Sequence, residues 1–209
     1  MEATPSRERW RATWSGLSVA GNDDRLYGEL IDLYSDKKRS YHTVQHLDEC
    51  FARLDEAREF AGKFHEIELA LWFHDAIYDV RKDDNEERSA AWAGDVALRA
   101  GVPQTASTRI HGLIIATKHN VIPDTADAKV IVDVDLSILG APMERFDEYE
   151  RQVRQEYSWV PGWLFRRKRR EILTGFLSRP HIYNTEHFIA TLEAQARANL
   201  ERSVKALGG

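Results

Sequence analysis

The sequence predicts a mostly α-helical protein. Apolar residues recur at three- and four-residue spacing along almost the whole chain, and alternating stretches, which would indicate strands, are nearly absent. Hydrophobic residues make up 43% of the 209 residues and charged residues 30%, which is too apolar for a disordered chain and predicts a heavily charged surface. The length fits one domain over residues 1–209 with one core.

The first half of the chain contains three apolar stripes that are typical of core-facing helices. They are Leu26, Leu30 and Leu33 after Asn22; Val44, Leu47, Phe51 and Leu54; and Leu69, Trp72 and Phe73. A further helix should run from about Asp84 to Gly101. Glycine there can adopt the left-handed cap conformation, and Pro103 prevents continuation of the helix.

The second half continues the helical pattern. The run Val130–Val134 is β-branched and would also suit a short strand, but Asp127 can cap a helix and Gly140 can end it, so we favour a helix. One further helix, from about Thr105 to Lys118 and His119, is indicated by Ile110, Leu113, Ile114 and Thr117. Three more are indicated by Phe146, Tyr149 and Val153; by Ile172–Leu177; and by Thr185–Leu207.

Charge and cysteine content narrow the classes of partner. The net charge of −5 lacks the basic field of a dedicated nucleic-acid binder, so we expect no nucleic-acid partner. Cys50 is the single cysteine, which excludes an internal disulfide and favours a reducing compartment. The start, Met1–Trp14, lacks the apolar core of a signal peptide, and no run approaches the ~20 apolar residues of a membrane span. We therefore expect a cytoplasmic protein without a membrane partner, and leave homo-oligomerisation open.

Two pairs of polar residues could carry chemistry. His42 and His46 are four residues apart on a predicted helix, so both should project to one side, although the spacing alone fits a surface pair equally well. His74 and Asp75 lie inside the apolar run Leu69–Tyr78. An ionised carboxylate buried there without a partner costs several kcal/mol, which a bound cation would offset. The alternative is that each is hydrogen-bonded within the core.

A second apolar run, Val130–Leu139, contains Asp133 and Asp135. On a helix these positions are about 200° apart, so only one of them can face a common site. Two histidines and two aspartates from three helices would form a mixed nitrogen and oxygen site. Such a site suits Mn, Fe, Co, Ni or Zn, or Mg if water fills the remaining positions. No phosphate-cradling glycine loop, cysteine cluster or Gly-x-Ser-x-Gly elbow competes with it.

Three segments in order carry a family resemblance: Tyr41-His42-Thr-Val-Gln-His46, Phe73-His74-Asp75 and Asp133-Val-Asp135-Leu. Together they resemble the HD superfamily of metal-dependent phosphohydrolases, in its small stand-alone branch, and the first is also similar to a segment of cyclic-nucleotide phosphodiesterases. The motif-bearing core is about 39–140, and the resemblance extends to 176–180 and 196–200. It implies a multi-helix HD-like bundle with a metal site between helices and with the C-terminal helices, 142–207, packing on the core.

Position by position, the resemblance implies that His46, His74, Asp75 and Asp135 are metal ligands and that His42 is the proton donor. The preference for Asp135 over Asp133 rests on the resemblance, and Asp133 stays open. We expect one tightly held divalent metal ion. A second is left open because His111 or His119 could fill the role of the extra histidines in some HD proteins, although this chain lacks the adjacent His-His of that pattern.

Other polar residues are candidates for substrate binding and catalysis. Asn85, Glu86 and Ser89 could share one face at the start of a helix, where free N–H groups can hold a phosphate. By resemblance Glu86 is a candidate base, and ordinary N-capping is an equal alternative. Lys118 could contact substrate phosphate and neutralise charge there, or simply favour the end of its helix.

The expected activity is hydrolysis of a nucleotide or other small phosphoester by metal-activated water, with that small phosphorylated molecule as the partner. The alternatives are a di-iron HD-type oxygenase, a non-catalytic metal- or nucleotide-binding module, and a structural domain with accidental motifs. The run Arg166–Arg170 follows Trp159, Trp163 and Phe165, and could bind a phosphate, an RNA or an acidic partner. A solvated helical face is the favoured interpretation of that run.

Overall fold

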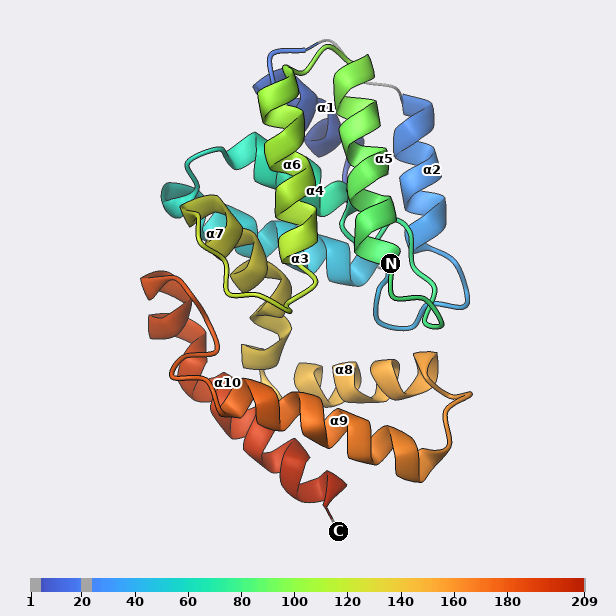
Figure 1. Cartoon of the computed structure of the whole chain (residues 1–209), viewed down its shortest axis with the longest axis vertical. Coiled ribbons are helices and arrows are strands. Elements are labelled where there is room, and N and C mark those ends of the chain that lie inside the picture. The colour runs from blue at the N-terminus through green and yellow to red at the C-terminus, as the bar shows by residue number, and fades with distance from the viewer. Residues whose placement is uncertain (1–4, 20–23, 209) are drawn as a thin grey trace. The chain divides into compact units, whose positions relative to one another are not determined.

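A computed structural model describes residues 5–19 and 24–208, and over these ranges the chain is helical with no strand (Figure 1). This confirms the all-α prediction. The helices are α1 (Arg7–Gly16), α2 (Asp24–Tyr34), α3 (Val44–Glu56), η1 (Arg58–Phe60), α4 (Phe64–Phe73), α5 (Asn85–Arg99), α6 (Gln104–Ala116), α7 (Ala126–Asp135), η2 (Leu136–Gly140), α8 (Met143–Glu156), α9 (Gly162–Leu177) and α10 (Glu186–Leu207).

The chain forms two compact units. Unit 1 comprises Met1–Val134 and unit 2 comprises Asp135–Gly209. The division falls within α7, whose last residue, Asp135, is the first residue of unit 2.

The core of unit 1 is built around α4. Every residue from Glu66 to Phe73 is buried, and α4 packs against α1, α3, α5 and α6 (Figure 1). Its two buried acidic residues are paired, Glu66 with Arg109 and Glu68 with Arg9, as buried charges require. On α1, Trp10 and Trp14 are buried, and the Trp10 ring meets Trp72 of α4 edge to face at 5.2 Å. Helix α1 was not predicted from the sequence, because its tryptophans stand among charged residues.

Three local predictions are wrong. His42 does not share a helix with His46, since Thr43 is extended and α3 begins only at Val44. Asp127 does not cap α7. Its carboxylate accepts from the Gly62 and Lys63 amides, while the Thr125 hydroxyl accepts from the Ala128 amide. The helix before Lys118 ends at Ala116 rather than at Lys118.

Other boundaries are as expected. Gly101 has a φ of 94° after α5, so a side chain there would be strained, as the predicted glycine cap requires. The run Val130–Val134 lies in α7 and is helical, not a strand. Asn22, after which the first apolar stripe begins, lies outside the described residues.

In unit 2, α10 packs against α9 and η2. The buried Asn199 amide donates to the carbonyls of Leu139 and Ala141, at 2.9 Å each, and satisfies the end of η2. The Arg197 guanidinium donates to the carbonyls of Leu177, Arg179 and Pro180. These contacts give the segments 176–180 and 196–200 a structural role. No helix over the described ranges is both long and apolar enough to cross a membrane.

Candidate metal centre

Two short stretches of chain bring the central residues together. On α3, His46 and Cys50 are four residues apart and both are buried. The α4 helix ends at Phe73, and His74 and Asp75 follow directly at its C-terminal end. A buried helix that ends in a polar pair thus presents that pair to the inner face of α3, against which it packs.

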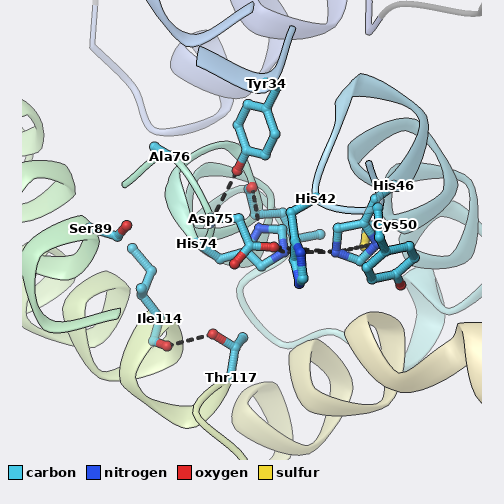
Figure 2. Close-up of polar contacts among 12 residues, drawn as sticks. Tyr34, His42, His46, Cys50, His74, Asp75, Ala76, Ser89, Ile114 and Thr117 are labelled. Atoms are coloured by element: carbon cyan, nitrogen blue, oxygen red, sulfur yellow. Dashed lines mark hydrogen bonds and ion pairs between the residues drawn. The ribbon is translucent and has the colours of Figure 1, made fainter. Parts of the chain in front are cut away.

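The polar atoms of three residues converge (Figure 2). The Nε2 atoms of His46 and His74 are 3.2 Å apart. The Asp75 Oδ2 atom lies 3.1 Å from His74 Nε2 and 3.5 Å from His46 Nε2. His46 and His74 are 2% and 1% exposed, so this cluster is largely shielded from water.

A main-chain contact sets the tautomer of His74. Its Nδ1 atom is 2.8 Å from the Leu71 carbonyl oxygen, which can only accept, so Nδ1 carries a hydrogen. In the neutral ring Nε2 therefore presents its lone pair to His46 and to the Asp75 carboxylate. Positive charge is needed among these atoms, either as protons on the imidazoles or as a cation.

The electrostatics of Asp75 agree with that requirement. Burial alone would raise the pKa of Asp75, but charge on His74 and His42 and hydrogen bonds from His46 and His74 hold its pKa well below the usual value. The carboxylate is therefore ionised. Its main-chain amide donates to the Tyr34 hydroxyl at 3.2 Å, which helps to fix the turn after α4.

A wider group of metal-type donors surrounds the two histidines. One ligand atom each from His46, Cys50, His74 and Asp135 lies within 4.8 Å of all the others. The Cys50 sulfur is 3.7 Å from both ring nitrogens of His46. Asp135 supplies the carboxylate from the last position of α7, whereas the buried Asp133 is not a member of this group.

The donor set fits a divalent metal ion. Ligand atoms that each lie about 2.1 Å from one ion are about 3.0–3.5 Å from one another, which is the spacing of the His46, His74 and Asp75 atoms. The Leu71 carbonyl orients His74 as outer partners orient metal-binding histidines. His46, Cys50, His74 and Asp135 form the group that could hold a metal ion, whereas the sequence predicts Asp75 in place of Cys50.

His42 lies at the edge of the cluster. Its ring stacks on Tyr78, with centroids 4.1 Å apart, and lies 5.9 Å from the ring of His46. It is more exposed than His46 or His74, so it can exchange protons with water. Figure 2 shows its side chain directed to the same region as Asp75 and His46.

Arg39 joins the two motif-bearing segments, and sequence reasoning missed it. Its guanidinium donates to the carbonyls of Asp75 (2.7 Å), Ala76 (2.8 Å) and His42 (3.2 Å). Arg39 therefore holds the main chain of His42, the candidate proton donor, beside that of Asp75, a candidate metal ligand. Nothing in the local pattern marks Arg39, because its acceptors are backbone atoms that become neighbours only on folding.

The polar residues that follow His74 and Asp75 in sequence hydrogen-bond to the loop between α4 and α5. Asn85 accepts from the Asp79 amide and donates to the Asp79 carbonyl, while the Ser89 hydroxyl accepts from the Ile77 amide. Glu86 is half-buried in the first turn of α5. The Lys118 ammonium donates to Glu87 at 2.5 Å and to the Asp83 carbonyl at 2.6 Å. Three of the four candidates, Asn85, Ser89 and Lys118, therefore hydrogen-bond to the loop between α4 and α5.

The candidates for a second metal lie outside the group. His111 is exposed on α6, and His119 follows that helix with a φ of 56°. Neither is among the four residues that form the metal-type group within the described ranges.

The basic run of α9 is not uniformly solvated. Arg166, Arg167, Lys168 and Arg170 are exposed, but Arg169 is buried and bonded to Glu150. The expectation of a solvated face therefore holds for four positions and fails for Arg169.

Cys50 is the other functional candidate that sequence reasoning missed. A signal existed, because Cys50 follows His46 by four residues on the same predicted helix.

No protein-family model matches the sequence, and searches of curated proteins and of solved structures gave no match. The candidate metal centre therefore rests on the geometry of the chain itself.

Proposed function

We propose that this protein is a metal-dependent phosphohydrolase that acts on a nucleotide or another small phosphoester. The observation that carries the proposal is the convergence of His46 Nε2, His74 Nε2 and Asp75 Oδ2 within 3.1–3.5 Å, with the lone pair of His74 oriented by Leu71. The ordered motif pattern that resembles HD phosphohydrolases supports the same chemistry.

The proposed ligands are His46, His74, Asp75 and Asp135. The group of donor atoms that lie within 4.8 Å of one another contains Cys50 in place of Asp75. Imidazole and thiol donors favour a transition metal or zinc over magnesium. A divalent ion held here would polarise a phosphoryl oxygen and lower the pKa of water for attack on phosphorus. His46 and His74 are buried and His42 is partly exposed, so substrate would approach from the side of His42.

His42 is the proposed proton donor to the leaving oxygen. Stacking on Tyr78 holds its ring, and Arg39 holds its main chain beside that of Asp75. Glu86 is retained as the candidate base. Lys118 could neutralise phosphoryl charge only if its ammonium leaves Glu87. We therefore place this role of Lys118 second to that of His42.

The test begins with metal content, measured by mass spectrometry on protein purified without chelator or nickel resin. We expect about one equivalent in the parent and almost none in Asp75→Asn, with Asp95→Asn as the control because Asp95 is well exposed on α5. Metal-loaded protein is then assayed against nucleotides and simple phosphodiesters. His42→Ala should keep the metal and lose about a hundredfold or more in kcat.

Three outcomes would contradict the proposal. Parent protein that binds none of Mn, Fe, Co, Ni, Zn or Mg would remove the mechanism altogether. Protein that binds metal through these residues but hydrolyses no phosphoester would support a non-catalytic metal-binding module instead. About two irons per chain would favour the oxygenase.

A further inference from the structure

A cavity in unit 2 shares no residue with the candidate metal centre. It has a volume of about 570 Å³, within the range of small-molecule sites. Faces of α8, α9 and α10 line it, and all of these helices belong to unit 2. Its lining includes Arg151, Arg154, Phe165, Arg166, Arg202 and Leu207. We call it the α8–α10 pocket.

The charge of the pocket is not balanced internally. Four arginines line it against two carboxylates, Asp147 and Glu150. Asp147 pairs with Arg202 at 2.6 Å. Glu150 pairs with the buried Arg169 and accepts from the Ser203 hydroxyl at 2.8 Å. Both carboxylates are therefore already committed to partners.

Two of the arginines keep their charge unmatched. Arg151 and Arg166 are exposed, and neither has a carboxylate partner among the residues that the structure describes. They come from different helices, α8 and α9, and line the same cavity. A guanidinium presents a planar fork of N–H donors that matches phosphate oxygens, so two of them can bind one phosphorylated group.

The rest of the lining is apolar and ordered. Phe165 is partly buried, and one face of its ring is covered by the Arg154 guanidinium at 4.8 Å. Arg154 is itself held by the carbonyls of Tyr157 and Val160. Leu207 and Ala206 of α10 complete an apolar wall beside the charged rim. A flat apolar group would therefore be received next to a bound phosphate.

We infer that the α8–α10 pocket binds a phosphorylated small molecule that carries a flat apolar portion, which is the chemistry of a nucleotide. A nucleic acid is disfavoured because the chain has a net charge of −5, which repels a long polyanion, while a pocket of about 570 Å³ suits one small ligand. The site shares no residue with the candidate metal centre, so it would act as a second, non-catalytic site.

The test is calorimetric titration of the full chain with ATP, in chelator, so that the metal centre does not contribute. The key variant is Arg151→Gln combined with Arg166→Gln. The control is Arg167→Gln. Arg167 lies on α9 beside Arg166, pairs with Glu171 and does not line the pocket. Circular dichroism checks that all proteins keep their helical content.

We expect ATP to bind with one site per chain and the double variant to bind at least roughly tenfold more weakly, with Arg167→Gln unchanged. Asp75→Asn should bind ATP as the parent does, which separates this site from the proposed active site. Adenosine and inorganic triphosphate should each bind more weakly than ATP.

Four results would overturn the inference. They are no ATP binding at millimolar concentration; binding that is lost in Asp75→Asn but kept in the double variant; triphosphate binding as tight as that of ATP; and a short single-stranded RNA that binds more tightly than ATP and depends on Arg151 and Arg166. The last result would assign the pocket to nucleic acid.

Discussion

The Nε2 atoms of His46 and His74 face each other at 3.2 Å, although the two residues are 28 positions apart in the chain. Nitrogen atoms that both carry lone pairs repel at this distance, so the contact needs a proton or a cation. The first prediction follows from that need.

Metal binding should stabilise the folded chain. A ligand that binds only the native state at about a hundredfold excess over its Kd adds about 2.7 kcal/mol, which raises Tm by several degrees. His74→Gln should abolish this shift, whereas His111→Gln, at an exposed position outside the group, should keep it. The measurement is thermal unfolding with and without added Zn²⁺ or Mn²⁺. Equal shifts in both variants would place the ion elsewhere.

Arg39 should act as a positioning residue. Arg39→Gln removes the donors to the carbonyls of His42, Asp75 and Ala76, so kcat should fall about 10- to 100-fold with a smaller change in KM. Arg39→Lys should recover little, because one ammonium cannot replace a planar fork. Lys38→Gln, an exposed neighbour, is the control. Unchanged kinetics in Arg39→Gln would refute the assignment.

Cys50 should report on metal occupancy. It is the single cysteine of the chain and is 2% exposed, so a thiol reagent must wait for local opening. Bound metal stabilises the closed site, and we expect chelation to speed labelling by roughly tenfold or more. Labelling is followed by mass spectrometry. Asp75→Asn should label rapidly with or without chelator, and a parent rate that ignores chelator would contradict the prediction.

Asp55 should contribute to acid sensitivity. Burial tends to raise its pKa, but hydrogen bonds and charge from Arg9, with a smaller effect from Arg58, lower it below the usual value. A carboxylate whose pKa is lower in the folded state than in the unfolded state stabilises the folded protein above the unfolded-state pKa. This stabilisation is lost as the pH falls through the folded-state pKa. Asp55→Asn should therefore show a smaller loss of unfolding free energy between pH 7 and about pH 3, measured by urea denaturation. Asp95→Asn should behave as the parent.

Two glycines offer a matched pair of stability tests. An alanine Cβ at Gly140 would lie 2.7 Å from Leu192 Cβ and 2.9 Å from the Leu192 carbonyl, whereas at Gly175 it would meet nothing within 4 Å. We expect Gly140→Ala to cost about 1–3 kcal/mol through overpacking. Gly175→Ala should gain about 0.5–1 kcal/mol, because alanine is a better helix former. Urea denaturation measures both, and an unaffected Gly140→Ala would contradict the close approach.

Much of the fold could be predicted because apolar spacing reports the buried face of a helix. The α4, α5 and α10 helices lie close to their expected positions. Helix α1 escaped prediction because Trp10 is buried against Trp72 of α4, 62 residues further along the chain, and Trp14 packs on Trp10. The placement of His42 failed for a local reason, since the extended Thr43 delays the start of α3.

The candidate metal centre was predictable where residue type alone implies chemistry. His46, His74 and Asp75 stand out because buried charge needs a partner. Arg39 could not be found in this way, since its role depends on carbonyl groups that every residue has. Within the basic run, Arg169 could not be told from its neighbours by sequence. It is buried because it bonds to Glu150 on another helix.

The hydrogen bond from His74 to Leu71 has a consequence for how this site tolerates change. The acceptor is a carbonyl that α4 leaves unused where it ends, so any residue that keeps the helix and fills the interior at position 71 offers the same oxygen. An alanine scan would miss this contact entirely. Replacing the amide between residues 71 and 72 with an ester, which weakens the carbonyl as an acceptor while keeping every side chain, would reveal it.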